Sequence, residues 1–279
     1  MLKFGLVSRT DKSEAMQVVR DIVEYLESHG HEALLETDTS LALDSPKHNL
    51  DLSEMETDFI ITVGGDGTIL RASMLMRNPE TPIISVNMGS RGFLTEVLPE
   101  EVMEALDNIL RGEYSIEDCL KLSSRSLSIE GQFPDALNEV LIASSLPSKT
   151  LDFSIKVDGK HILDVQADGI IVAPPTGSTA YNLSAGGSII APQVEAMIIT
   201  AICPYSYFRS IVVPSSSVIE IELLKLNVDG LVIIDGREYT GLKPLSKVEI
   251  RHSEYKTRFV RFKSFYHRLE KRLIFRRLK

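Results

Sequence analysis

Hydrophobic positions in the first 114 residues alternate between short continuous apolar runs and segments with helical spacing. Strands are expected at residues 3–8, 31–37, 58–63 and 81–87, and amphipathic helices at 12–30, 68–77 and 99–114. Residues 40–56 are polar and acidic and predict a loop or a weak helix. Alternation of strand and helix predicts a doubly wound α/β domain, in which helices cover both faces of a parallel sheet.

The pattern changes after about Cys119, where apolar runs become short and rich in β-branched residues. Strands are expected at residues 126–131, 152–162, 167–174, 217–224, 231–239 and 247–252. Asp-Gly pairs in "VDGK" and "IDGRE" predict hairpin turns. We therefore predict an α/β domain at residues 1–118, a β-rich domain at 119–250 and a C-terminal segment at 251–279.

Charge is distributed unevenly. The chain carries a net charge of −9, yet residues 251–279 contain eleven Lys and Arg and only two Glu. This segment has amphipathic helical spacing, with one stripe of Phe265, Leu269, Leu273 and Arg276 and with Phe262 and Tyr266 beside it. A basic tail can bind nucleic acid. We favour the alternative, in which this helix packs back on the acidic N-terminal domain.

Composition excludes few classes of protein. No apolar run approaches the roughly 18–20 residues of a membrane span, and the N-terminus lacks a signal-peptide pattern. We expect a cytoplasmic protein. Cys119 and Cys203 match no zinc or redox spacing, which predicts two reduced thiols.

The apolar run 59–63 leads directly into Gly64-Gly65-Asp66-Gly67-Thr68. Glycines at the carboxyl end of a parallel strand let backbone N–H groups approach an anion, and a following helix directs its positive end the same way. No Lys follows, so this is not a P-loop. Asp66 fits this setting as a metal ligand or as a base that accepts a hydroxyl proton; alternatively it is only a helix cap.

Two further elements are polar and rich in small residues. In Asp168–Ser188, the run "PPTGSTAYNLSAGG" can line a polyhydroxylated or phosphorylated ligand, and Tyr181 can stack on a base. Asn138-Glu139 enters an apolar strand, either as a strand-end cap or as a pair of ligand contacts. Taken alone, the 168–188 run could instead be a Gly/Ser-rich loop between strands.

Together these motifs resemble the NAD kinase family, in its ATP- or polyphosphate-dependent archaeal and bacterial type. The matching segments are 64–68, "NMGSRGFL" at 87–94, Asn138-Glu139, 168–187 and "AICPYSYFRSIVVP" at 201–214, in the family's order. The resemblance implies an N-terminal α/β domain and a C-terminal β-sandwich-like domain. It also implies ATP as donor, Mg²⁺ or another divalent cation, and a homodimer or homotetramer. From composition and charge we expect no membrane partner and do not favour a nucleic-acid partner.

The resemblance carries over to individual residues. It implies that Asp66 is the general base that accepts the proton of the adenosine ribose 2′-hydroxyl of NAD. The positions that match NAD-binding residues are Asp66, Gly67, Asn138, Glu139, Asp168, Thr179, Ala180, Tyr181, Asn182 and Ser184. Weaker ligand contacts are implied at Gly65, Thr68, Arg71, Asn87, Phe93, Lys149, Gln166, Thr176, Ser178 and Arg237. No metal ligand can be named.

Two other functions remain open at the level of sequence. A lipid kinase shares Gly-Gly-Asp-Gly but predicts an apolar membrane-facing patch and no dinucleotide site. A catalytically silent nucleotide-binding sensor would keep the ligand contacts without the reaction, and the presence of Asp66 argues against it.

Overall fold

The computed structural model describes residues 1–45, 49–89, 92–128, 131–147, 149–225 and 228–273. The chain divides into two compact units. The first unit is Met1–Asp118 together with Thr257–Lys279, and the second unit is Cys119–Lys256.

The first unit contains a parallel sheet with the strand order β3-β2-β1-β4-β5, and Phe259 near the end of β16 pairs with β5. Its strands are β1 (Lys3–Ser8), β2 (Glu32–Glu36), β3 (Asn49–Leu50), β4 (Phe59–Gly64), β5 (Ile83–Asn87) and the last residues of β16 (Lys247–Arg261). Its helices are α1 (Ser13–Ser28), α2 (Thr37–Ala42), α3 (Asp66–Leu75), the 3₁₀ turn η2 (Pro99–Glu101), α4 (Val102–Leu110) and α6 (Phe265–Leu273).

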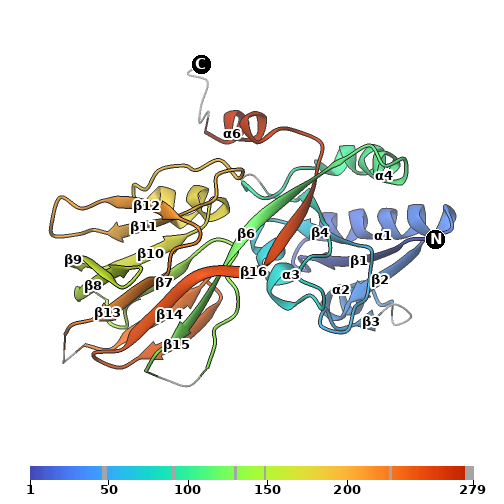
Figure 1. Cartoon of the computed structure of the whole chain (residues 1–279). Coiled ribbons are helices and arrows are strands. Elements are labelled where there is room, and N and C mark those ends of the chain that lie inside the picture. Colours follow the sequence, from blue (N-terminus) through green and yellow to red (C-terminus); the bar gives the residue numbers. More distant parts are fainter. Residues whose placement is uncertain (46–48, 90–91, 129–130, 148, 226–227, 274–279) are drawn as a thin grey trace, which may run out of the picture. The chain divides into compact units, whose positions relative to one another are not determined.

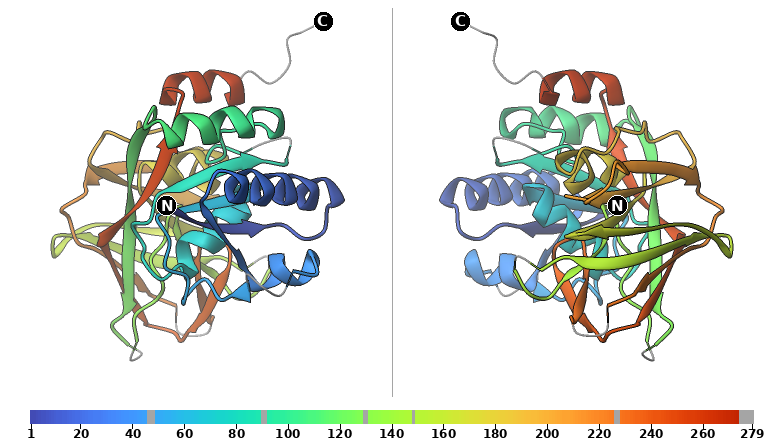
Figure 2. Two further views of the ribbon diagram at one scale, coloured as in Figure 1. Left: turned by 90° about the vertical axis from the view of Figure 1, so that its right-hand side faces the viewer. Right: turned by 90° about the vertical axis from the view of Figure 1, so that its left-hand side faces the viewer.

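Helices cover both faces of this sheet, as the sequence predicts. Five of the six β1 residues and all six of β4 are buried, which is the pattern of strands covered on both sides. Helices α1 and α4 pack on one face over a core that includes Phe4 and Leu6, and α2 and α3 lie on the other face (Figure 2). The core places the carboxyl ends of β4 and β5 side by side, with Gly64 opposite Asn87.

Two details differ from the sequence prediction. Residues 40–56 do not form one loop or helix: α2 begins earlier, at Thr37, and β3 adds a two-residue strand. Helix α3 begins at Asp66 instead of Thr68, because Gly65 is extended (φ −109°, ψ −171°) and acts as the N-cap. Asp66 is therefore the first residue of the helix.

The second unit is β-rich and sandwich-like, with two sheets (Figure 1). One is antiparallel with the order β12-β11-β10-β7-β14-β15, and in the other β16, β13, β8 and β9 are neighbours while β6 pairs with β16. The remaining elements are β6 (Ser115–Ser126), β7 (Val140–Ser144), β8 (Leu151–Val157), β9 (Lys160–Ala167), β10 (Gly169–Ala173), η3 (Thr176–Thr179), α5 (Tyr181–Ser184), β11 (Ala196–Ile202), β12 (Ser210–Pro214), β13 (Ile219–Leu223), β14 (Gly230–Ile234) and β15 (Glu238–Leu242).

The predicted hairpin turns form. Asp158-Gly159 (φ 50° and 74°) joins β8 to β9, and Asp235-Gly236 (φ 51° and 65°) joins β14 to β15. Of the strand predicted over 126–131, only Ser126 lies in a strand, as the last residue of β6; Leu127 and Ser128 form a bend, and residues 129–130 lie outside the described residues. Charged residues within β6 hid its β pattern, and the structure buries one of them, Lys121.

The final helix packs on the first unit, as predicted. Lys263 pairs with Glu101 at 3.0 Å and Arg268 with Glu117 at 2.7 Å. The packed stripe is less apolar than predicted, because Arg268 is buried and Arg272 half-buried, while Tyr266 is 68 % exposed. Arg276 lies outside the described residues.

Candidate active site

The glycine-rich turn between β4 and α3 is shaped by close packing. A Cβ on Gly64 would clash with the Thr68 hydroxyl and would lie 2.9 Å from the Thr68 Cβ. Glycine is therefore required here so that Thr68 can fold over the end of the strand. The turn directs the Asp66 side chain toward the segment that follows β5.

The Asp66 carboxylate is held by three successive backbone N–H groups of that segment. Phe93 N donates to Oδ2 at 2.8 Å, and Leu94 N and Thr95 N donate to Oδ1 at 3.2 and 3.4 Å. A Cβ on Gly92 would clash with Oδ1 and would lie 3.0 Å from the Asp66 Cγ. The carboxylate is thus oriented by the backbone and needs glycine beside it.

Two opposing effects set the proton affinity of Asp66. Burial raises the pKa of this carboxyl above its ordinary value, and the three N–H groups and Arg272 oppose the rise without cancelling it. The residue as a whole is only half-buried. A partly buried, oriented carboxylate with a raised pKa is suited to accept a proton from a hydroxyl group.

In the second unit, Asn138 and Glu139 are held by Asp235. The Asp235 carboxylate accepts the backbone N–H groups of Leu137, Asn138 and Glu139 at 2.9, 2.8 and 3.0 Å. Asp235 lies in the β14–β15 turn with φ 51°, a conformation that Asp tolerates better than most residues. Because Asp235 binds the backbone of residues 137–139, immediately before β7, the Asn-Glu pair enters this strand in a fixed orientation.

Three buried oxygens around this pair have no hydrogen-bond partner among the residues that the structure describes: Asn138 Oδ1, Glu139 Oε2 and Thr176 Oγ1. A Cβ on Gly177 would clash with the Asn138 backbone and would lie 2.7 Å from its Cα, so η3 approaches this strand closely. Burial, then repulsion from Asp235, raises the pKa of Glu139 to about 7. Unsatisfied buried oxygens are costly unless a ligand supplies donors.

Other residues of the small-residue loop hold the loop itself together. Asn182 is fully buried; its amide nitrogen donates to Ser178 O and Ser188 O, and its oxygen accepts from Thr200 Oγ1 at 2.6 Å. Ser178 Oγ donates to Pro175 O, and Thr179 Oγ1 donates to Thr176 O at 3.1 Å. The polar groups of these side chains are used internally, whereas Tyr181, Ser184 and Asp168 are exposed.

The remaining predicted contacts differ in their burial and in the interactions of their side chains. The Arg71 guanidinium is bound by Glu36 at 2.7 Å and Asp38 at 3.1 Å, so two carboxylates of its own unit occupy it. Asn87 Oδ1 accepts the Gly89 N–H at 3.0 Å. Three of the predicted contact residues are exposed: Lys149, Arg237 and Gly67. Five others are half-buried: Gly65, Thr68, Phe93, Ala180 and Gln166.

Sequence reasoning assigned no role to three residues that organise these sites: Gly92, Asp235 and Arg272. The Asp-Gly pair at 235–236 was noted only as a turn signal. An Asp between an apolar strand and a turn glycine could have indicated a buried carboxylate. Nothing in the sequence places Arg272 near Asp66.

The described ranges contain neither a cluster of metal-binding side chains nor a membrane-spanning helix. No three His, Cys, Asp or Glu side chains lie close enough together there to hold a metal ion. No helix in this part of the chain is long and apolar enough to cross a membrane.

Comparisons with known proteins agree with this geometry. Residues 4–114 match the family model of the ATP-NAD kinase N-terminal domain, and residues 137–262 that of the C-terminal domain. The NAD kinase of Methanothermobacter thermautotrophicus is 40 % identical over 279 residues, covering 98 % of this chain and 97 % of that protein. The NAD kinase of Pyrococcus abyssi is 40 % identical over 264 residues, covering 94 % of each chain.

Solved structures are similar over nearly the whole chain. A yeast NADH kinase complexed with NADH has a TM-score of 0.88 at 23 % identity, covering 100 % of this chain and 90 % of that one, which bears on the fold alone. An NAD kinase from Archaeoglobus fulgidus in complex with ATP has a TM-score of 0.79 at 27 % identity, covering 97 % and 98 %. With both domain models matched in order, the chain belongs to the NAD kinase family.

Proposed function

We propose that this chain transfers the terminal phosphoryl group of ATP to the adenosine ribose 2′-hydroxyl of NAD, with Asp66 as general base. The orientation of the Asp66 carboxylate by three backbone N–H groups carries this proposal. The hydroxyl proton passes to Asp66 while the oxygen forms its bond to the γ-phosphorus. The bond from that phosphorus to the β–γ bridging oxygen breaks, and ADP leaves.

The second unit supplies the proposed NAD contacts. The unpartnered oxygens of Asn138, Glu139 and Thr176 can accept hydrogen bonds from an adenine amino group or from ribose hydroxyls. Tyr181, which is 43 % exposed, offers its ring for stacking. Asp168, Ala180 and Ser184 are kept as proposed contacts, whereas Asn182, Ser178 and Thr179 are assigned to shaping the loop.

The phosphoryl donor and the divalent cation are proposed on different grounds. ATP is supported by the family match and by the ATP complex of the Archaeoglobus relative. The described residues do not fit a metal ion held by protein side chains alone. We therefore propose that a divalent cation such as Mg²⁺ enters with ATP, held mainly by phosphate oxygens and water. Arg71 is left out of the phosphate contacts.

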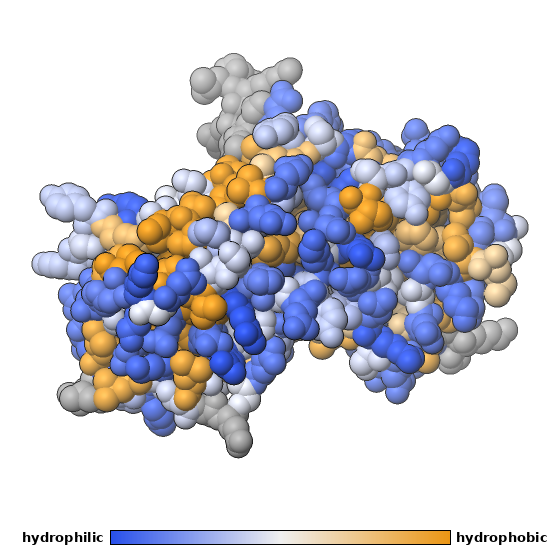
Figure 3. Space-filling view, in the orientation of Figure 1, coloured by the Kyte–Doolittle hydropathy of each residue, from blue (hydrophilic) through white to orange (hydrophobic). Residues whose placement is uncertain are grey.

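A homodimer or homotetramer is also proposed. Hydrophobic residues gather over the part of the second unit that contains β11 and β12 (Figure 3). Strand β12 is the end strand of its sheet, with Val212 51 % exposed, and the preceding loop exposes Tyr205 (90 %) and Tyr207 (102 %). An apolar edge of this kind is typical of a surface covered by another chain.

The test measures NADP formed from NAD, Mg²⁺ and ATP, with a parallel reaction on polyphosphate. We expect Asp66→Asn to lower kcat by about 10²–10⁴-fold, because the general base is lost. The variant should still bind NAD in calorimetry, since its second unit is unchanged. Near-normal turnover by Asp66→Asn would refute the assignment of the base. No NADP from wild-type protein that binds NAD would favour the sensor function.

A further inference from the structure

Three arginines from β16 and α6 lie in the first unit close to three carboxyl groups. Arg261 is 4 % exposed and Arg268 7 % exposed, and Arg272 is half-buried. Such burial of guanidinium groups is unusual and requires partners for each N–H group. The three arginines are not satisfied to the same degree.

Arg261 and Arg268 each bind both a carboxylate and a backbone carbonyl. Arg261 Nε donates to Glu117 at 2.8 Å, and its Nη1 donates to Leu94 O at 2.9 Å. Arg268 Nη2 contacts both Glu117 oxygens at 2.8 and 2.7 Å, and its Nη1 donates to Lys263 O at 2.9 Å. These two residues therefore attach the C-terminal segment to the first unit.

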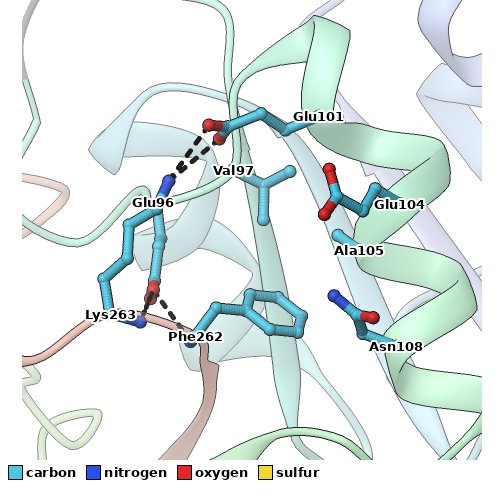
Figure 4. Close-up of a pocket in the computed structure, with 8 residues that line it drawn as sticks. All are labelled: Glu96, Val97, Glu101, Glu104, Ala105, Asn108, Phe262 and Lys263. Carbon is cyan, nitrogen blue, oxygen red and sulfur yellow. Dashed lines mark hydrogen bonds and ion pairs between the residues drawn. The ribbon is translucent and has the colours of Figure 1, made fainter.

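The nearby Glu96 carboxylate is also occupied. One of its oxygens accepts the backbone N–H groups of Phe262 at 2.9 Å and Lys263 at 2.6 Å (Figure 4). Its other oxygen accepts from Arg261 Nη1 at 3.3 Å. Glu96 and Glu117 are thus committed to the chain segment that leads into α6.

Arg272 is held on one side only. Its Nη2 donates to Thr95 O at 2.8 Å and contacts Thr95 Oγ1 at 3.4 Å. Its Nη1 is buried and has no hydrogen-bond partner within the described ranges. The backbone N–H of the same Thr95 donates to Asp66 Oδ1 at 3.4 Å, so one residue joins the guanidinium to the proposed base.

A buried N–H donor left unpaired on a cation costs free energy, and this cost is recovered when an anion binds. Asp66 does not meet this need, because its oxygens accept backbone N–H groups and no ion pair joins it to Arg272 in the described part of the chain. Burial lowers the pKa of Arg272 and the negative charge of Asp66 opposes this, which leaves a charged guanidinium beside the base.

We propose that Arg272 is a phosphate-contacting residue, whose Nη1 donates to a non-bridging oxygen of the terminal phosphate of the donor. The proposal rests on the proposed function and extends it. During transfer the phosphorus–oxygen bond to the leaving diphosphate breaks and the bond to the ribose oxygen forms. Arg272 neutralises negative charge on the equatorial oxygens and takes no proton.

The experiment compares Arg272→Ala and Arg272→Lys with Lys271→Ala, an exposed neighbour on the same helix. We expect Arg272→Ala to lower kcat by about 100-fold or more and to weaken ATP binding, with unchanged NAD affinity. Arg272→Lys should recover only part of this, because one ammonium cannot replace the two-sided contact of a guanidinium. Lys271→Ala should match the wild type.

A structural role of Arg272 would give different results. Guanidinium ion added to Arg272→Ala should restore part of the lost kcat if a missing phosphate contact is the cause, and should have no effect on Lys271→Ala. ATP affinity is measured by calorimetry without NAD, so this measurement tests Arg272 independently of turnover. If the wild-type protein makes no NADP, the proposed function is refuted, but the ATP affinities still test the role of Arg272. Wild-type kcat and ATP affinity in Arg272→Ala would overturn the proposal. A fall in thermal midpoint with no rescue, in both Arg272 variants, would also overturn it.

Discussion

Asp66 in the first unit and Asp235 in the second are held by the same hydrogen-bond arrangement. Each carboxylate accepts three consecutive backbone N–H groups, from residues 93–95 and from residues 137–139. Burial raises the pKa of both. They differ in burial, because Asp235 is buried, with 6 % of its surface exposed, while Asp66 is only partly buried.

This difference indicates what each carboxylate can do. Asp66 as a whole residue is only partly buried, and the N–H groups orient the carboxylate that is proposed to act as the base. At Asp235 the held group is enclosed, and the groups that remain free belong to its neighbours Asn138 and Glu139. The same backbone arrangement therefore orients a proposed base in one unit and positions proposed ligand contacts in the other.

Among the variants that distinguish the roles of Asp66 and Asp235, we expect the largest effect from Gly92→Ala. The new Cβ would clash with Asp66 Oδ1 and approach Thr95 Oγ1 to 2.9 Å, so the carboxylate must move. We expect kcat to fall by about 100-fold, since misplacement by about 1 Å can cost that much. NAD affinity should stay unchanged, because Asn138 and Glu139 belong to the other unit.

Gly241→Ala is the matched control, because a Cβ there meets nothing within 4 Å. Both variants are checked by thermal melting, NADP formation and NAD calorimetry. Unchanged kcat in Gly92→Ala would show that the orientation of Asp66 by residues 93–95 does not matter for turnover.

A second prediction uses the pKa of Glu139, which is about 7 in the folded protein against an ordinary 4.5. The folded state binds more protons between pH 4.5 and 7, so the free energy of unfolding falls as pH rises through this window. The loss is on the order of 3 kcal/mol. Ionised Glu139 accepts ribose hydroxyls better, so NAD affinity should rise from pH 6 to pH 8.

Glu139→Gln should flatten the pH dependence of NAD affinity and reduce the fall of the free energy of unfolding with rising pH. Asp235 should account for the pH dependence of stability that remains, since its pKa is raised too. Asp235→Asn should shift the NAD profile to lower pH, because its charge raises the pKa of Glu139. Urea titrations and NAD calorimetry over this range measure both. An identical profile in wild type and Glu139→Gln would exclude Glu139 as the titrating group.

The smallest effect is expected for Thr176→Val. The Thr176 hydroxyl has no partner in the described part of the chain, so its removal should leave stability unchanged or slightly increased. NAD affinity should fall about fivefold, the equivalent of one lost hydrogen bond of about 1 kcal/mol. Thr179→Val, which loses the 3.1 Å bond to Thr176 O, should instead lower the thermal midpoint. Equal NAD affinity in wild type and Thr176→Val would remove Thr176 from the site.

Sequence predicted the first unit well, because buried parallel strands and amphipathic helices have strong hydrophobic patterns. Strand β6 was placed wrongly because its charged residues concealed its β pattern. Lys121 is buried in β6 and interacts with Asp135 and Asp235, which are distant in sequence. Long-range charge partners of this kind leave no local signal.

The sequence by itself determined the α/β and β-rich halves, the glycine turn around Asp66, the Asn138-Glu139 pair and the family, because these depend on residues close together in the chain. Only the tertiary structure decided which polar groups have hydrogen-bond or ion-pair partners within the protein and which do not. Arg71 is bound by Glu36 and Asp38, and Asn182 is used inside its loop, whereas Thr176 Oγ1 and Arg272 Nη1 have no partner among the described residues. The physical reason is that a hydrogen-bond partner is set by distance in space, and residue type alone does not encode it.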